Sequence, residues 1–189
     1  MVANHPFDGL EGLVLLALLR HVRPDVRLMA NYLLRSVPEI RSAMFFGVPF
    51  GSIDAPARNR SSLRAAIRWL KQGGALGVFP AGEVAYLNMC RRRVVDPLWN
   101  NFVARLIKRG QASVVPIYFD GRNSNLFQLV GLVHPRLRTV MLPREILRKR
   151  DSRIHLCLGR PIPYAWLDGA SNCEHTMAYL RMRTRNVLF

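Results

Sequence analysis

The sequence predicts an α/β fold, with one domain over residues 1–189 and a mostly parallel or mixed central sheet flanked by helices. The chain has 189 residues and half of them are apolar, which is enough for one ordinary core. Short apolar runs alternate along it with longer amphipathic ones. The 13 glycines and 12 prolines are spread between these runs rather than gathered in one linker, so no second domain is predicted.

The first half of the chain opens on an Asn-His-Pro turn at residues 4–6. An α/β domain normally places a buried strand before such a turn, and only three residues precede it here. We therefore expect the fold to lack its first strand and the chain to be truncated at its N-terminus. The elements expected next are a helix at 9–21, a short strand at 26–31, a helix at 32–44 interrupted by Pro38, and an amphipathic helix at 56–74.

The second half of the chain alternates in the same way. A buried strand begins at residue 75 and runs into a Pro-Gly loop that ends at residue 83, the kind of place where open α/β sheets bind ligands. The remaining expected elements are a helix at 97–109, a strand at 112–121, a loop at 122–125, an apolar segment at 126–133, a mixed segment at 135–151, a strand at 153–162 and a helix at 172–188.

The charge balance points to a polyanionic partner. The chain carries 28 Lys and Arg against 12 Asp and Glu, a net charge of +16, which suits either nucleic acid or an anionic membrane surface. A nucleic-acid binder should show a stacking or groove-reading motif, whereas the aromatic residues here fall at core spacings, so nucleic acid is not expected. Basic clusters that a membrane enzyme would set against anionic headgroups, or that simply form a solvated face, are Arg91 to Arg93 and Arg144, Arg148, Lys149 and Arg150.

Cysteine use and hydropathy place the chain on the cytoplasmic side of a membrane, as a peripheral protein. Cys90, Cys157 and Cys173 are far apart and in no metal-ligand spacing, so reduced, inert thiols are expected. No secretory signal is visible. The most apolar run, residues 13–19, is much shorter than the roughly 20 residues that a spanning helix needs.

The first turn carries the chemistry that stands out. His5 is followed by two carboxylates, Asp8 and Glu11. A histidine backed by a carboxylate can act as a general base near neutral pH, because the anion fixes the imidazole tautomer and stabilises the imidazolium. The alternative is that His5 is a turn residue and Glu11 a solvated charge at the start of a helix.

Three motifs, in order, resemble one protein family. "NHPFDGLEG" at 4–12, "FPAGEV" at 79–84 and "VVPIYFDGRNS" at 114–124 are similar to the glycerolipid acyltransferase family that includes lysophosphatidic acid acyltransferases. The similarity is greatest to its hemolysin-like bacterial branch, which is related to ornithine-lipid synthesis, and it covers nearly the whole chain. The resemblance implies a glycerol-3-phosphate acyltransferase-like fold.

The resemblance also favours Glu11 over Asp8 as the partner of His5. In the hemolysin-like branch, five residues separate the histidine from an acidic residue followed by Gly, and His5, Glu11 and Gly12 match that spacing. The physical argument agrees, because a carboxylate in the first turn of the following helix can reach back to the imidazole. His5 and Glu11 are therefore the predicted catalytic dyad.

The other motifs imply residues that bind substrate. Phe79, Pro80 and Gly82 match the loop that holds the acceptor, with Gly82 allowing close approach of a substrate to the backbone. Ala81 stands where a glutamate is common, and Glu83 either binds a hydroxyl or amine of the acceptor or caps the next element. Further candidates, each with a solvated face or a turn as the alternative, are Arg58 and Arg60 for a phosphate or carboxylate of the acceptor, and Arg122 and Asn123 in the "GRNS" segment.

The predicted function is transfer of a fatty acyl chain from a thioester to a hydroxyl of a lysolipid, either a lysophospholipid or a lyso-ornithine lipid. The donor is acyl carrier protein or coenzyme A charged with the chain, and no metal or bound cofactor is required. The competing prediction is a non-catalytic module, either a basic membrane- or nucleic-acid-binding protein or an inactive truncated relative.

Overall fold

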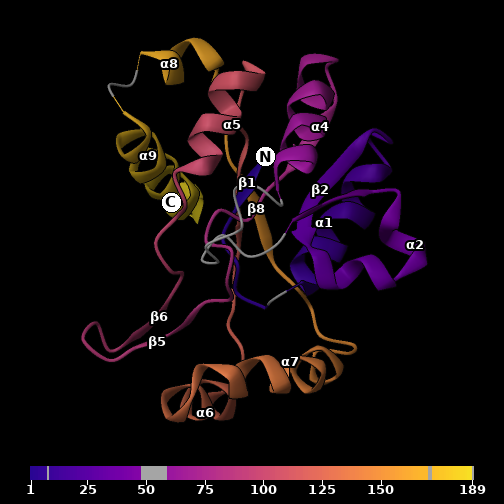
Figure 1. Ribbon diagram of the computed structural model, residues 1–189. Coiled ribbons are helices and arrows are strands. Elements are labelled where there is room, and N and C mark those ends of the chain that lie inside the picture. Colours follow the sequence, from indigo (N-terminus) through magenta and orange to yellow (C-terminus); the bar gives the residue numbers. More distant parts are fainter. Residues whose placement is uncertain (8, 48–58, 170–171, 189) are drawn as a thin grey trace.

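The computed structural model describes residues 1–7, 9–47, 59–169 and 172–188 (Figure 1). The strands are β1 (Val2–Ala3), β2 (Val26–Asn31), β3 (Met44–Gly47), β4 (Ala75–Gly77), β5 (Tyr86–Asn88), β6 (Arg93–Val95), β7 (Pro116–Phe119) and β8 (Leu156–Leu158). The helices are α1 (Leu10–Arg20), α2 (Pro38–Arg41), α4 (Arg60–Lys71), α5 (Phe102–Gly110), α6 (Asn125–Val133), α7 (Pro135–Arg148), α8 (Tyr164–Asp168) and α9 (Cys173–Arg185), with 3-10 turns at Tyr32–Ser36 and Asn186–Leu188.

The strand before the histidine turn is present, so the expectation that it is missing was wrong. β1 runs parallel to β7 on one side, and Val2 bridges Val78 beyond the end of β4 on the other. The backbone N–H of Val2 donates to Val115 O (3.0 Å) and that of Ala3 to Val78 O (3.1 Å). Two residues suffice because both edges are paired and both side chains are buried.

β1 joins the two halves of the sheet. The parallel strands β3, β2 and β4 form one half, and β1, β7 and the antiparallel β8 form the other. The bridge between Val2 and Val78 connects them. The result is a mixed sheet flanked by helices, which confirms the predicted α/β class.

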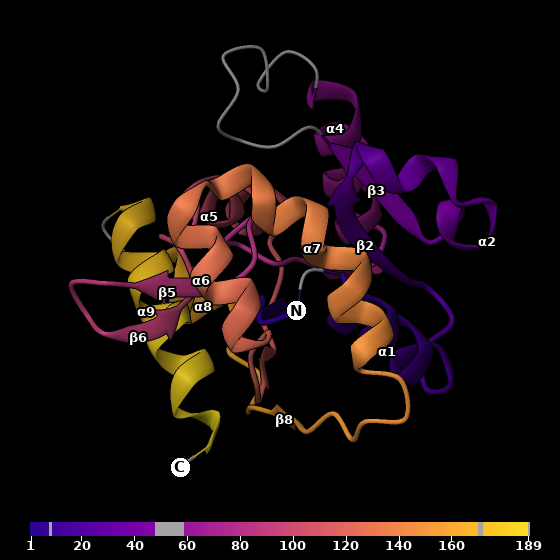
Figure 2. The ribbon, with the colours of Figure 1, turned by 90° about the horizontal axis from the view of Figure 1, so that it is seen from below.

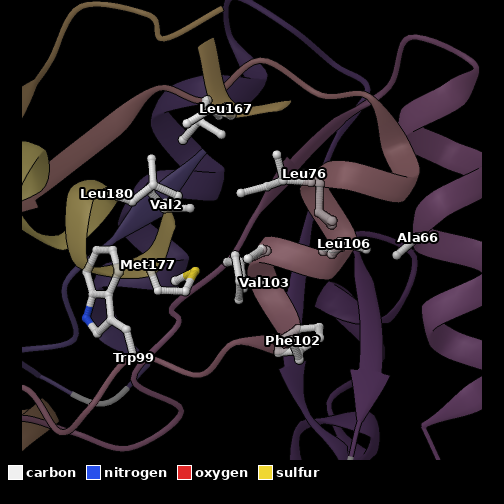
Figure 3. Packing of buried hydrophobic residues seen from close by; sticks show 14 of the residues in the cluster. Val2, Ala66, Leu76, Trp99, Phe102, Val103, Leu106, Leu167, Met177 and Leu180 are labelled. Atoms are coloured by element: carbon white, nitrogen blue, oxygen red, sulfur yellow. The ribbon is translucent and has the colours of Figure 1, made fainter. Parts of the chain in front are cut away.

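Hydrophobic residues fill both faces of this sheet. Val2 and Ala3 point to opposite faces, as successive strand residues do. Val2 packs in a cluster with helices α4, α5 and α9, which contribute Ala66, Val103 and Leu180 (Figure 3). Ala3 belongs to the second cluster, which includes side chains of α1, β2 and β7. Strand β1, which leads to His5, is therefore packed between two hydrophobic clusters.

The long helix predicted at 32–44 is wrong. This stretch forms a 3-10 turn, the short helix α2 and strand β3 instead. Val37, which precedes Pro38, is extended (φ −93°, ψ 104°), because a proline disfavours the helical conformation in the residue before it. Met44 then pairs with Leu28 of β2, and this long-range pairing overrides local helix propensity.

The remaining elements follow the sequence with shifted bounds. Strand 26–31 is confirmed in full, and α1, α4, α5 and α9 lie within the predicted helical stretches, apart from the final Gly110 of α5. Of the helix predicted at 56–74, residues 56–58 lie outside the described residues. The segments at 126–133 and 135–151, left without a predicted conformation, form α6 and α7. The hairpin of β5 and β6 and the short helix α8 were not predicted.

Candidate active site

The side chain of Asn4 fixes the turn after β1, because it forms the same kind of hydrogen bonds as a neighbouring strand. Asn4 Nδ2 donates to Phe119 O (2.8 Å), and Asn4 Oδ1 accepts from the backbone N–H of Phe119 (2.7 Å). This pair of hydrogen bonds continues the pairing of β1 with β7 by one residue. His5 therefore follows a strand end that is held in place by hydrogen bonds.

His5 and Glu11 come together at this strand end, as the sequence predicted. His5 Nδ1 lies 2.5 Å from Glu11 Oε1, and the two side chains are 11% and 0% exposed. Gly9, with φ +104°, makes the tight entry into α1 that brings Glu11 back to the histidine. Asp8, the other predicted candidate, lies outside the described residues.

Two phenylalanines enclose this pair. The backbone N–H of Phe7 donates to Glu11 Oε1 (3.1 Å), and the Phe79 ring stacks on the His5 imidazole with the ring centroids 4.8 Å apart. Gly12 of α1 faces the Phe79 ring, which a Cβ at this position would meet at 3.5 Å. The dyad is thus held from α1, from the turn and from the loop after β4.

The electrostatics keep the Glu11 carboxylate ionised despite its burial. Burial alone raises its pKa, but attraction to His5, the hydrogen bond from the His5 ring and the backbone N–H groups of Glu11 and Phe7 together hold the pKa of Glu11 below its ordinary value. An ionised carboxylate at Nδ1 places the imidazole proton there and leaves Nε2 as the basic nitrogen. The pair has the arrangement of a general base with its orienting anion.

Asp96 is a site residue that the sequence analysis missed. Its Oδ1 accepts from the backbone N–H of His5 (3.2 Å), and its Oδ2 accepts from the indole N–H of Trp99 (3.2 Å). Arg181 donates to the backbone carbonyl of Asp96 (2.6 Å). Burial raises the pKa of Asp96 above its usual value. Asp96 comes 91 residues after His5, so no local sequence pattern predicts this contact.

We expect Asp96→Asn to lower both stability and turnover. An amide has one acceptor oxygen, so the N–H of His5 or of Trp99 would face an NH₂ group, at a cost of about 1–3 kcal/mol in the free energy of unfolding. A shift of the His5 backbone by a fraction of an ångström should lower kcat by up to about a hundredfold. Urea unfolding and steady-state kinetics measure the two effects.

Asp151→Asn is the matched control for this change. The Asp151 side chain is 93% exposed and its backbone has φ +61°, a conformation that Asn tolerates. Equal unfolding free energies and equal kcat values for the two variants would show that Asp96 does not position His5.

The loop after β4 lies beside the dyad and carries four predicted residues. Phe79 reaches His5 directly. Pro80 is buried, while Gly82 and Glu83 are exposed, and Gly82 has φ +68°, which a glycine adopts without strain. Backbone bonds join this loop to the site, since Ala85 N–H donates to His5 O (2.8 Å). The structure gives Glu83 no described contact with the dyad.

The "GRNS" segment packs against the same turn through a buried charge cluster. Asn123 Oδ1 accepts from Lys149 Nζ (2.6 Å), and Lys149 lies 3.6 Å from Glu145 Oε2. Glu145 in turn accepts from the backbone N–H of Ser124 (2.8 Å) and from its hydroxyl (2.5 Å). The Lys149 ammonium stands 4.8 Å from the centre of the Phe7 ring. Asn123 is therefore near the dyad, but as part of a packed cluster.

The arginines predicted to bind the acceptor are less closely tied to the dyad. Arg122 and Arg60 are exposed, and Arg60 is the first residue of α4. Arg58 lies outside the described residues. A cavity of about 600 Å³ between β3 and α4 is lined by Asn59 and by two other arginines, Arg35 and Arg41, rather than by these.

Metal chemistry has no evident site in the described ranges. Among residues 1–7, 9–47, 59–169 and 172–188, no group of His, Cys, Asp and Glu side chains could hold a metal ion. The described groups that contact His5 include the Glu11 carboxylate at its ring and the Asp96 carboxylate at its backbone N–H. Such a set suits removal of a proton from a hydroxyl group.

Comparisons with known proteins agree on one family. A family model described as "Acyltransferase" matches residues 1–188. Lyso-glycine lipid O-acyltransferase of Phocaeicola vulgatus is 27% identical over 179 residues, which cover 88% of this chain and 60% of that protein. The protein of the same name from Bacteroides thetaiotaomicron is 26% identical over 192 residues, which cover 95% of this chain and 66% of that protein.

A solved structure shares the fold. The crystal structure of the 1-acyl-sn-glycerophosphate (LPA) acyltransferase PlsC from Thermotoga maritima superposes with a TM-score of 0.54 at 18% identity, over 99% of this chain and 63% of that chain. The chain thus spans less than two thirds of the length of each of these relatives.

Proposed function

Because this chain belongs to the acyltransferase family, we propose that it transfers a fatty acyl chain from a thioester to the hydroxyl group of a lysolipid. One observation carries the proposal: the buried pair of His5 and Glu11, 2.5 Å apart at the end of β1. A docking module has no use for a buried histidine whose ring nitrogen is held by a buried carboxylate, so this geometry favours an enzyme over the non-catalytic alternative.

The proposed reaction needs one base and no covalent enzyme intermediate. His5 Nε2 takes the proton of the lysolipid hydroxyl as its oxygen attacks the thioester carbonyl, and Glu11 stabilises the imidazolium that forms. The tetrahedral intermediate then collapses, the C–S bond breaks, and the departing sulfur takes the proton from His5. The products are an ester and a free thiol.

The acceptor and the donor are proposed at different levels of detail. Two relatives are named for a lyso-glycine lipid, so we propose this lysolipid as the first acceptor to test, ahead of lysophospholipids and lyso-ornithine lipids. Coenzyme A and acyl carrier protein remain equal candidates for the donor. Arg58, Arg60 and Arg122 remain predicted contacts for an anionic group of the acceptor.

We also propose that the chain works at the surface of an anionic membrane, on its cytoplasmic side. Lysolipids reside in membranes, and the net charge of +16 suits an anionic surface. In the described part of the chain, each helix is too short or too polar to cross a bilayer. A peripheral association accounts for both features.

An acyl-transfer assay over a panel of lysolipids and both donor types tests the proposed function. Lyso-glycine lipid, lysophosphatidic acid and lyso-ornithine lipid are each offered with acyl-coenzyme A and with acyl carrier protein, and the ester product is measured by mass spectrometry. We expect ester formation with at least one combination and a matching release of thiol. A folded protein that forms no ester in any combination, and that binds RNA instead, would support the non-catalytic alternative.

A further inference from the structure

Helices α6 and α7 expose an unusual row of large apolar side chains. Leu126, Leu129 and Val133 of α6 are 47%, 57% and 80% exposed, and Leu137, Val140 and Leu147 of α7 are 40%, 74% and 73% exposed. The spacing of three, four and seven residues places each set along one stripe of its helix. Exposed apolar residues that gather in this way mark an interaction surface.

The opposite stripes of the same helices hold them to the protein. Phe127 and Gln128 of α6 are buried, and Gln128 Oε1 accepts from the backbone N–H of Leu87 in β5 (2.8 Å). The guanidinium of Arg138 in α7 stands 4.3 Å from the centre of the Tyr86 ring. The two helices are therefore docked, and the described residues leave their outward stripes exposed.

This surface lies next to the candidate active site. Figure 1 shows α6 and α7 together at the lower end of the molecule, below the histidine turn, and Figure 2, seen from below, shows them in front of the sheet. Lys149, directly after α7, touches the Phe7 ring, and the backbone N–H of Phe7 donates to Glu11. A lipid reached through α6 and α7 would arrive close to the dyad.

Positive charge accompanies the apolar stripe. The side chains of Arg144 and Arg150 are 53% and 85% exposed, and Arg148 is also exposed. Lys149, which the sequence grouped with them, is only 14% exposed and is engaged with Asn123 and Glu145. The surface thus combines leucine and valine with arginine, which is the composition of a helix that lies in the interface of an anionic bilayer.

A second copy of the chain suits this surface poorly. A two-fold contact places the same patch on both subunits, so the arginines of both copies, Arg144, Arg148 and Arg150 of each, would be gathered in one contact. An anionic bilayer pairs these arginines with phosphate groups and takes up the apolar side chains at the same time.

We propose that the outward face of α6 and α7 is the surface with which this chain docks on an anionic lipid bilayer, presenting the dyad to lysolipid in that bilayer. The choice of a bilayer as the occupant rests on the proposed function. The apolar side chains enter the interface, and the arginines bind headgroup phosphates.

Vesicle sedimentation tests the surface with two double variants and two matched controls. Leu129→Gln with Leu147→Gln removes apolar area, and Arg144→Gln with Arg148→Gln removes charge, while glutamine preserves helix propensity. The controls are Val22→Gln with Trp166→Gln, which are 86% and 73% exposed elsewhere, and Arg64→Gln with Arg68→Gln on α4. The vesicles contain phosphatidylcholine alone or with phosphatidylglycerol.

We expect wild type to bind only the vesicles with phosphatidylglycerol. The arginine variant should bind about 30-fold more weakly, because each arginine contributes about 1 kcal/mol at such a surface. The leucine variant should bind about tenfold more weakly. The control at Val22 and Trp166 should bind within about twofold of wild type. The control at Arg64 and Arg68 should also do so, once the effect of its two lost positive charges on the overall attraction to the vesicle is subtracted. Equal losses in variants and controls, or self-association that the leucine variant abolishes, would overturn the proposal.

A comparison of acyl transfer to a soluble acceptor with acyl transfer to a vesicle-bound acceptor tests the docking surface separately from the proposed function. With active protein, the leucine variant should lose far more transfer to lysolipid in vesicles than to a short-chain acceptor in solution. Absence of acyl transfer in every condition, with docking through α6 and α7 intact, would overturn the function and leave the docking surface standing.

Discussion

Glu11→Gln is expected to lower kcat of acyl transfer by about a hundredfold to ten-thousandfold while the fold is retained. An amide in place of the carboxylate cannot stabilise the imidazolium, and it also permits the wrong imidazole tautomer. Glu11 Oε1 receives both the His5 ring and the N–H of Phe7, so the glutamine retains the shape of the site but not its charge. Steady-state kinetics with a lysolipid and an acyl thioester measure the loss.

Two further variants sharpen this result. Glu11→Asp keeps the charge on a shorter side chain and should recover part of the lost rate. Glu174→Gln removes an exposed carboxylate from α9 and should leave kcat within about twofold of wild type, as expected for a surface change away from the site. A rate for Glu11→Gln as high as that of Glu174→Gln would exclude Glu11 from catalysis.

Glu145→Ala is expected to produce the largest loss of stability. Glu145 is 1% exposed and satisfies the N–H and hydroxyl of Ser124 as well as the Lys149 ammonium. Its removal takes this acceptor from both donors of Ser124 and leaves the Lys149 ammonium with Asn123 Oδ1 but no paired carboxylate, at a cost of about 2–4 kcal/mol in the free energy of unfolding. In a chain of this length such a loss lowers Tm by about 5–15 °C, which calorimetry detects.

The stability that Glu145 supplies should also depend on pH. Burial opposes ionisation, but the hydrogen bonds from Ser124 and the charge of Lys149 hold the pKa of Glu145 below its ordinary value. A carboxyl with a lowered folded pKa contributes stability above the unfolded pKa and loses it as pH falls through the folded value. The gap in unfolding free energy between wild type and Glu145→Gln should therefore be full at pH 6 and shrink below pH 4.5. A gap that is constant down to pH 3 would contradict this assignment.

The sequence anticipated the parts of the site that are local in the chain. His5 and Glu11 are six positions apart, and their pairing was predicted from the motif that resembles the acyltransferase family together with the reach of a carboxylate in the first turn of the following helix. Secondary structure with strong helical periodicity, such as α4 and α5, was predicted for the same reason.

The parts that depend on distant contacts were not predicted. Asp96 reaches the N–H of His5 across 91 residues, and Glu145 reaches Ser124 across 21. Strand β1 was expected to be missing because only three residues precede the histidine turn, and its existence depends on pairing with Val115 and Val78. Residues 32–44 were misassigned to one helix because the pairing of β3 with β2 outweighs the local helical signal.

One comparison tests the central claim, that the His5–Glu11 pair catalyses acyl transfer to a lysolipid. Wild type and His5→Ala, matched for folded fraction by circular dichroism, are given lyso-glycine lipid in anionic vesicles and an acyl thioester, and the initial rate of ester formation is measured. We predict that wild type forms ester with stoichiometric release of thiol, and that His5→Ala is slower by about a hundredfold to ten-thousandfold. Equal rates for the two proteins would contradict the claim.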